Sequence, residues 1–291
     1  MDLHQNYRPE TAAPSAQNYG EFEPCKELRP YIRCFWEAAD DPRLVTPDTC
    51  ADILFLIDHA AGQVESWFCG VNDRPFFSQP EKRRQQVSLF AIRFYAWSAV
   101  FFADDSLRGT RNGFFNARQH FFTLCRKLPP KLLQAASMAE RIRAAEECLI
   151  AVLCPGQGSP IVQNAVLTLL KSRGAFSIDS LAGAVFVSRR QLERLFREQL
   201  GLSPKRLASL VRYQYLWNEI LSARDFCVQD AVNRYGYADQ AHLLHDFKRF
   251  HSLSVVQARQ HAVSNVAFLQ ENSPSFCYNK KKKQEREDIG Q

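Results

Sequence analysis

The stretch FVSRRQLERLFREQLGLSPKRL, residues 186–207, places basic side chains among leucines and phenylalanines at helical spacing. At about 100° per residue, the apolar arc holds Leu192, Leu195, Phe196 and Gln199. The opposite arc is charged and holds Arg189, Arg190, Glu193, Arg194 and Arg197. Ser188 is a suitable N-cap, and Ser177 or Asp179 can begin the helix before it. The stretch predicts two helices joined by a short turn, the second with one buried wall and one arginine-rich wall.

The arginine-rich wall has two interpretations when this unit is taken alone. Arg189, Glu193 and Arg197 have the i,i+4 spacing of ion pairs on a solvated helix face. A short helix after a tight turn is also how a recognition helix is presented to the major groove. Both interpretations fit one unit equally well.

The same arrangement occurs a second time, in VQDAVNRYGYADQAHLLHDFKRF from Val228. Gly236 supplies the turn, fifty residues after Phe186, and Asp239 can cap the second helix. Its inner wall is predicted to hold Leu243, Phe247 and Phe250, and its outer wall Gln240, Ala241, Leu244, His245, Lys248 and Arg249. This duplication favours DNA binding, because an enzymatic function does not explain why the unit occurs twice.

Between the units, SPKRLASLVRYQYLWNEILSA (203–223) predicts one helix with Pro204 in its first turn. About twenty residues at ~1.5 Å each make a rod of roughly 30 Å. Successive major-groove faces of DNA are ~34 Å apart. A spacer of this length suits two recognition helices in adjacent groove segments on one side of DNA.

The net charge of +6 is concentrated in this part of the chain. Residues 156–270 hold fourteen Lys/Arg and eight Asp/Glu, whereas residues 1–155 hold eighteen and nineteen. A polyanionic partner for the second half alone would explain that asymmetry.

These residues resemble the C-terminal DNA-binding domain of AraC-type (AraC/XylS family) transcription regulators, which has two helix-turn-helix units joined by a long helix. The similarity covers about 100 residues, from Ile161 to near His261. It rests on Leu192, Arg194, Leu195, Phe196, Leu200, Gly201, Ser203, Pro204, Tyr235, Gly236, Tyr237, His242, Phe247, Lys248 and Arg259. The resemblance implies a sequence-specific DNA-binding regulator, an activator rather than a repressor, that meets RNA polymerase at promoter DNA.

The sequence departs from the family pattern at several positions. Phe186 stands where the turn often has Gly, and Leu244 and His245 replace a small polar residue followed by Arg. Ser252 and Val255 replace the Gly and Pro of the family's closing G-x-S-P stretch. The first unit is therefore expected to lead base recognition.

The predicted base contacts of the first unit are Arg189, Arg190, Glu193 and Arg194. Arg197 is predicted to lie nearer the DNA backbone. Arginine forms bidentate hydrogen bonds with guanine, and Glu accepts from cytosine N4. In the second unit Gln240 suits adenine and Leu244 a thymine methyl, while Ala241, His242, His245 and Lys248 complete the candidate contacts. Lys205 and Arg206 are candidate phosphate contacts, which position a protein without specifying sequence.

The first half of the chain has the pattern of short strands. The runs PYIRCFW, CADILFLID, ESWFCGV and QVSLFAIRFY are separated by Pro, Asp, Asn and Gly. The sequence thus predicts an α+β fold: a β-rich, sandwich- or barrel-like domain with following helices, then an all-α domain. The predicted divisions are a sensing or dimerisation domain at 1–155, the DNA-binding domain at 156–270, and a disordered polar tail at 271–291. Residues 1–20 are expected to form a mobile arm.

The segment from Lys131 to Leu153 is predicted to form one long helix with a heptad-type apolar seam. The seam holds Ala135, Met138, Ile142, Ala145, Leu149 and Val152. Two functions remain open for it: packing against its own β-rich domain, or pairing in a homodimer. The motif CPGQGSP (154–160) predicts the linker between the domains.

Two rival functions remain open beside the plain regulator. Cys34, Cys50 and Cys69 are the residues that a cysteine-based alkyl-transfer protein, or a metal or redox sensor, would use, although their spacing fits no compact metal motif. Alternatively, the N-terminal domain binds a protein antagonist rather than a small-molecule effector. The preferred prediction is a non-enzymatic, cytoplasmic regulator without cofactor, metal or membrane attachment.

Overall fold

The computed structural model describes residues 7–10, 19–38, 43–78, 87–223, 225–264 and 276–277. In the first half, a six-stranded antiparallel sheet has the order β1-β2-β7-β4-β5-β8. Its strands are β1 Tyr19–Phe22, β2 Ile32–Ala38, β4 Cys50–Asp58, β5 Gln63–Cys69, β7 Val87–Tyr95 and β8 Phe114–Asn116. A separate antiparallel pair is formed by β3 Arg43–Val45 and β6 Phe76–Ser78. The four predicted strand runs are confirmed as β2, β4, β5 and β7.

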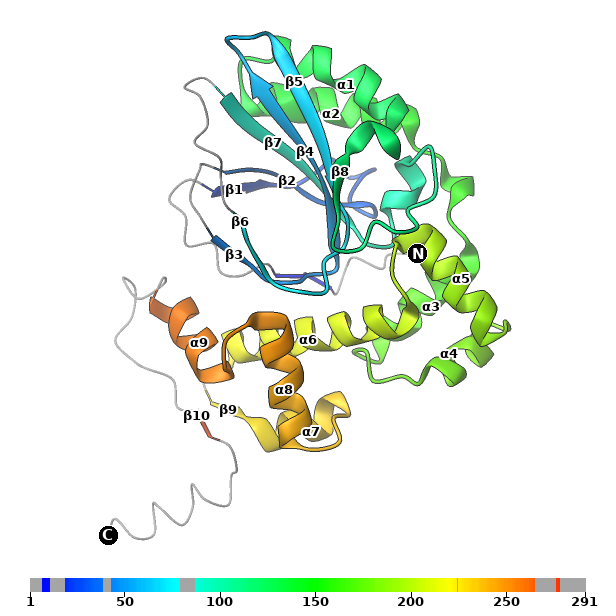
Figure 1. Ribbon diagram of the computed structural model, residues 1–291, viewed down its shortest axis with the longest axis vertical. Helices are drawn as coiled ribbons and strands as arrows, with labels where there is room; N and C mark the ends of the chain where they lie inside the picture. The colour runs from blue at the N-terminus through cyan, green and yellow to red at the C-terminus, as the bar shows by residue number, and fades with distance from the viewer. Residues whose placement is uncertain are drawn as a thin grey trace.

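Alternation along β4 separates the two faces of the sheet. Ile53, Phe55 and Ile57 are fully buried, whereas the residues between them are partly exposed. Successive side chains of a strand point to opposite faces, so β4 has one core face and one more polar face. The core face lies toward helices α1 Phe122–Gln134 and α2 Met138–Val152, which cover the sheet in Figure 1.

The single long helix predicted over 131–153 is wrong. The helix is interrupted at residues 135–137, between α1 and α2. There the Ser137 hydroxyl accepts a hydrogen bond from the Glu140 N–H at 3.3 Å. The Glu140 carboxylate in turn accepts from the Ala136 N–H at 2.7 Å, which completes a capping arrangement at the start of α2. Ala145 and Leu149 of the predicted seam are fully buried in the chain's own core. Of the two functions left open for the seam, these two residues serve intramolecular packing.

The second half is helical and is organised around α6, Pro204–Ser222. The other helices are α3 Pro160–Lys171, α4 Ile178–Ala184, α5 Arg189–Leu200, α7 Val228–Tyr235, α8 Gln240–His251 and α9 Val255–Ser264. Figure 1 shows α4–α5 and α7–α8 toward opposite ends of α6. The α+β fold class is therefore confirmed, including the two helix-turn-helix units and the long helix between them.

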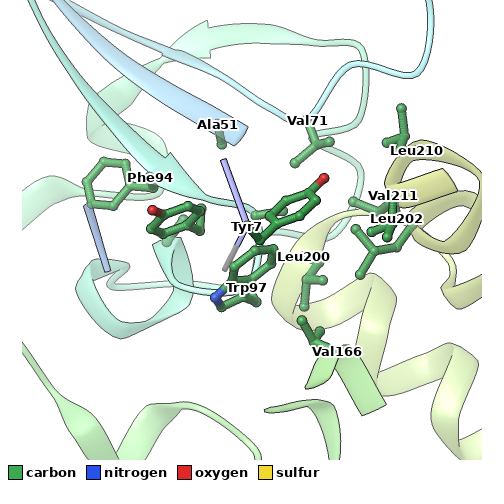
Figure 2. Packing of buried hydrophobic residues seen from close by; sticks show 14 of the residues in the cluster. Tyr7, Ala51, Val71, Phe94, Trp97, Val166, Leu200, Leu202, Leu210 and Val211 are labelled. Atoms are coloured by element: carbon green, nitrogen blue, oxygen red, sulfur yellow. The ribbon is translucent and has the colours of Figure 1, made fainter. Parts of the chain in front are cut away.

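One buried cluster joins the two halves. It includes Trp97 after β7, Val166 of α3 and Leu210 of α6. Figure 2 shows Tyr7 and Trp97 near Leu200, Leu202 and Val211 from the helical half. Three short 3-10 helices lie along the connections: η1 Ala99–Phe102, η2 Ala117–Gln119 and η3 Pro155–Gln157, the last within the predicted linker.

The predicted mobile arm is wrong where the structure describes it. Tyr7 is buried and its ring lies 5.4 Å from that of Tyr215 on α6. The Gln214 side chain bonds the backbone of Glu10 in both directions, at 2.7 and 3.0 Å. A short polar segment is thus held by the buried face of α6.

Of the predicted tail, only β10 Phe276–Cys277 is described, paired in parallel with β9 Phe226–Cys227. The remainder of residues 271–291 lies outside the described residues. Within the described part of the chain, no helix combines the length and apolar character needed to cross a membrane.

Candidate nucleic-acid interface

The first helix-turn-helix unit is fixed by two side-chain caps and a left-handed turn. The Ser177 hydroxyl caps α4, and the Ser188 hydroxyl accepts from the Gln191 N–H at 3.2 Å to cap α5. Between them, Phe186 has φ +57°. Its N–H donates to the Gly183 carbonyl and the Val187 N–H donates to the Ala182 carbonyl, both at 3.1 Å. The predicted helix boundaries and turn are confirmed.

Helix α5 has the two walls that its sequence predicts. Leu192, Phe196 and Leu200 are buried, whereas Leu195 and Gln199 are only partly so. The outer wall carries four exposed arginines: Arg189, Arg190, Arg194 and Arg197. Glu193 lies among them and is partly buried.

Most of these arginines are already in ion pairs on the helix. Glu193 receives Arg189 and Arg197, each at 3.3 Å, and Glu198 receives Arg194 at 3.0 Å. Arg189 also reaches Asp179 of α4 at 3.4 Å. Such exposed pairs contribute little stability, typically ~0.2–1 kcal/mol each. They therefore hold the guanidinium groups on the helix face only weakly.

The ion-paired helix face and the exposed arginine-rich face, which were the two interpretations of the first unit, are therefore the same surface of α5. The i,i+4 ion pairs form, and the arginines remain exposed. Among the described residues, Arg190 has no ion pair, which makes it the guanidinium of the four most readily available to an anion.

The second unit repeats the geometry. Gly236 ends α7 with φ +65°, and the Asp239 carboxylate accepts from the His242 N–H at 2.7 Å to cap α8. Leu243, Phe247 and Phe250 are buried, as predicted. The exposed candidates on α8 are Ala241, His242, His245 and Lys248.

Three candidates of the second unit have contacts within the protein. Gln240 donates to the Gln229 side chain at 2.8 Å. His242 accepts from the Ala238 N–H at 3.3 Å and meets the Tyr237 ring edge to face, with centroids 5.2 Å apart. Leu244 packs partly against the core. Like the outer wall of α5, this wall therefore has part of its side chains engaged within the protein.

Helix α6 connects the units as a largely buried rod. Its 19 residues correspond to about 28 Å at 1.5 Å per residue. Tyr213, Leu216 and Trp217 are among its buried side chains. Arg212, on the same helix, donates to the Gly174 carbonyl at 2.9 Å and lies 5.0 Å from the Tyr237 ring centre. The rod thus contacts the segment that precedes the first unit and the turn of the second unit.

The two phosphate candidates in the first turn of α6 have different surroundings. Lys205 is exposed. Arg206 instead forms an ion pair with Asp73, at 2.8 Å, and Asp73 belongs to the β-rich half. Asp73 is buried and also receives Arg111 at 3.4 Å. Sequence reasoning missed Asp73, because nothing in its local pattern indicates a partner so far along the chain.

Further contacts attach the first unit to the β-rich half. The Leu107 N–H donates to the Glu198 carbonyl at 2.8 Å, and the Ser106 hydroxyl reaches the same carbonyl at 3.1 Å. Within the helical half, the Gln199 side chain accepts from the Ser159 N–H at 3.1 Å. The C-terminal end of α5 therefore lies against the 104–112 loop.

The thiols of Cys34, Cys50 and Cys69, which were considered for alkyl transfer or metal binding, do not form a cluster. Cys34 pairs with Arg93, Arg93 with Asp52, and Asp52 with Cys69, so Cys34 and Cys69 stand three strand spacings apart in the sheet. At ~4.8 Å per spacing this is about 14 Å. Burial raises the pKa of each of the Cys34 and Cys69 thiols to about 12, and also raises that of Cys50. Among the described residues no group of three or more His, Cys, Asp or Glu side chains is placed to hold a metal.

Comparison with known families gives one match in each half of the chain. Residues 181–261 match a family described as a helix-turn-helix domain. Residues 20–112 match a domain of unknown function (DUF6597). Comparison with curated proteins gave no match.

Several solved structures are similar to parts of the chain. The C-terminal domain of AraT, a response regulator from Geobacillus stearothermophilus, is 28% identical over 35% of this chain and 86% of its own, with a TM-score of 0.34. A transcriptional regulator of the AraC-type DNA-binding domain-containing proteins from Chromobacterium violaceum is 23% identical over 35% and 92%, with a TM-score of 0.33. ToxT from Vibrio cholerae O395 is 8% identical over 84% and 100%, with a TM-score of 0.41.

Proposed function

The chain carries the helix-turn-helix domain of AraC-type DNA-binding transcription regulators, and from this premise we propose that it binds promoter DNA through two adjacent major-groove segments. Helices α5 and α8 are the recognition helices in this proposal. The observation that carries it is the repeated unit: two capped helix-turn-helix pairs on one buried rod. A rod of about 28 Å is commensurate with the ~34 Å repeat of the major groove.

The first unit supplies the leading base contacts. Arg190 and Arg194 are exposed on α5 and suit bidentate hydrogen bonds to guanine. Arg189 and Glu193 extend this set, with Glu193 as an acceptor for cytosine N4. Arg197, about one turn after Glu193 on α5, contacts the DNA backbone. To bind, the arginines exchange weak surface ion pairs for phosphate or base acceptors, which costs little.

The second unit adds a smaller share of base recognition. We assign Gln240 to adenine and Leu244 to a thymine methyl; both also have contacts within the protein. Ala241, His242, His245 and Lys248 complete the surface that faces DNA. Lys248 is the only Lys or Arg among the α8 candidates, whereas α5 presents four arginines, and this difference supports a secondary role for α8.

Phosphate contacts come from the first turn of α6. Lys205 is exposed and free to reach the backbone. Arg206 joins it only by leaving Asp73. The two residues position the protein on DNA and carry no sequence information.

The division of labour follows the two halves of the chain. Residues 156–270 bind DNA, and residues 1–155 receive an effector, either a small molecule or a protein. Asp73 contacts the start of α6, and Leu107 and Ser106 contact the end of α5, which gives the β-rich half a direct route to the DNA-binding half. We infer activation, with RNA polymerase as the further partner. A homodimer, if formed, uses a surface other than Ala145 and Leu149, which are buried.

Genome-wide mapping of occupied sites tests the function. The expected result is a shared motif upstream of a limited set of genes, with two conserved segments about 10 base pairs apart. Loss of expression of these genes on deletion supports activation. Scattered occupancy without a motif would contradict sequence-specific regulation.

A further inference from the structure

Phe186 is a large apolar side chain placed almost wholly in solvent. It is 94% exposed, compared with 57% for Phe114 and 53% for Phe122 among the described residues. It lies in the turn between α4 and α5, two residues before the Ser188 cap. A ring so exposed buries almost no surface in the folded chain, so it contributes little to folding.

The turn does not need a ring at this position. Its backbone is left-handed, with φ +57°, a conformation that Gly adopts freely and that is unfavourable for a residue with a Cβ. The second unit has Gly236 at the corresponding place, with φ +65°. Phe186 therefore combines a strained backbone with an exposed ring, and local strain of this kind concentrates at functional positions.

The surroundings of Phe186 point to DNA as the occupant. It lies three residues before Arg189, the first residue of α5, where Arg189 and Arg190 are exposed. The first residues of a recognition helix are those that meet base edges. The apolar feature of a base edge in the major groove is the thymine methyl, and Phe is one of the side chains that contact it.

We propose that Phe186 is a specificity-determining residue that packs on the methyl group of a thymine at the edge of the site read by α5. The assignment rests on the proposed function, since it assumes that α5 enters the major groove. It adds an apolar contact from the turn to the polar contacts from the helix. Such a contact releases no counterions, so it changes affinity without changing the salt dependence of binding.

The test uses the full-length chain and a binding site obtained by selection from random duplexes. Affinity is measured by fluorescence anisotropy on the native probe and on probes in which each thymine is replaced in turn by deoxyuridine, which lacks the methyl. The variants are Phe186→Gly and, as a control, Leu221→Ala, which shortens another exposed apolar side chain at the end of α6. Thermal unfolding checks the fold, and Phe186→Gly is expected to melt at or above the wild-type temperature because Gly suits the turn.

We expect removal of one thymine methyl from the DNA and removal of the Phe186 ring from the protein to weaken binding by similar factors. Wild-type protein binds one deoxyuridine probe about fourfold more weakly, the effect of one buried methyl. Phe186→Gly binds the native probe more weakly by at least about this factor and does not respond to that same deoxyuridine. The slope of log affinity against log salt stays unchanged, and Leu221→Ala behaves as wild type.

Two outcomes would overturn the assignment while leaving the proposed function intact. In the first, Phe186→Gly binds the native probe with wild-type affinity. In the second, it binds more weakly but keeps the wild-type response to every deoxyuridine. If instead the wild-type protein selects no preferred sequence, the proposed function itself fails, and this assignment with it.

Discussion

The Asp73 carboxylate of the β-rich half lies 2.8 Å from the Arg206 guanidinium in the first turn of α6. The carboxylate is buried, whereas the Arg206 side chain is 40% exposed. The Asn112 side chain also donates to it at 2.7 Å. A residue proposed to contact DNA phosphate is thus held by the half of the protein proposed to receive an effector.

Removing the charge of Asp73 weakens the attachment between the halves. Asp73→Asn keeps the shape but loses charge-assisted hydrogen bonds, and we expect the free energy of unfolding to fall by about 1–3 kcal/mol. Chemical denaturation measures this loss. The matched control is Asp105→Asn, an exposed carboxylate in the neighbouring loop, which should change stability by less than ~0.5 kcal/mol. Equal effects of the two variants would show that the Asp73 contacts contribute little.

The same substitution is expected to change DNA binding in the opposite direction. Arg206 is released from Asp73 and becomes available to a phosphate, so affinity rises and the salt dependence steepens by about one released counterion. Binding measured from low to moderate salt gives the slope. In Asp73→Asn combined with Arg206→Ala the gain should vanish; a gain that persists would assign it to another residue.

Arginine substitutions on α5 separate recognition from positioning. Arg190→Ala or Arg194→Ala is expected to weaken specific binding by about 1–3 kcal/mol and to relax preference at one base pair. Lys205→Ala should weaken all sequences equally and lower the salt slope by about one. A gel-shift series on single-base variants of the site measures the base preference. The same assay at several salt concentrations measures the slope, with Arg126→Ala on α1 as the control. Unchanged affinity and preference in the α5 variants would contradict the assignment.

Ser252 provides a stability test of the left-handed backbone. It ends α8 with φ +66°, at a position where Gly carries no steric penalty. Ser252→Gly is therefore expected to raise the free energy of unfolding by about 1 kcal/mol. Ser209→Gly, inside α6, should instead lower it by about 0.5 kcal/mol, because Gly is unfavourable in a right-handed helix. Denaturant titration of both variants reports the two signs, and destabilisation by Ser252→Gly would contradict the prediction.

Thiol reactivity tests the alkyl-transfer alternative. Burial raises the pKa of Cys34 and of Cys69 to about 12. A raised pKa means less of the reactive thiolate at neutral pH, so both should alkylate slowly in the folded protein and rapidly after unfolding. Cys154, which is exposed, serves as the fast internal reference in mass spectrometry of iodoacetamide-treated protein. Fast, stoichiometric modification of Cys34 or Cys69 in the folded protein would favour the alternative.

The helical half was predicted more fully than the β-rich half, and the reasons are local. Ser177, Ser188 and Asp239 are caps adjacent to strongly periodic helices, so the boundaries of α4, α5 and α8 follow from short-range signals. The helix break at 135–137 also has a signal, the Ser137–Glu140 capping pair, but the apolar periodicity that continues across it predicts an unbroken helix. Burial of Tyr7 had none, because it depends on Tyr215 and Gln214, which are distant in sequence.

In the candidate site, too, some features follow from the local sequence and others depend on how distant segments pack. Exposure of the α5 arginines follows from helix periodicity, which sequence contains. The pairing of Arg206 with Asp73 depends on how the two halves pack, which the local pattern around neither residue indicates. The strain at Phe186 is intermediate: the missing Gly is visible in the sequence, but the left-handed backbone and the exposed ring are visible only in the structure.

Hydroxyl-radical footprinting of the full-length protein on a selected site tests the central claim most directly. Two recognition helices on one rod predict two protected segments, centred about 10 base pairs apart on one side of the duplex. Arg190→Ala should weaken the protection of one segment more than that of the other. One protected segment, or two on opposite sides of the duplex, would contradict the placement of α5 and α8 in adjacent major-groove segments.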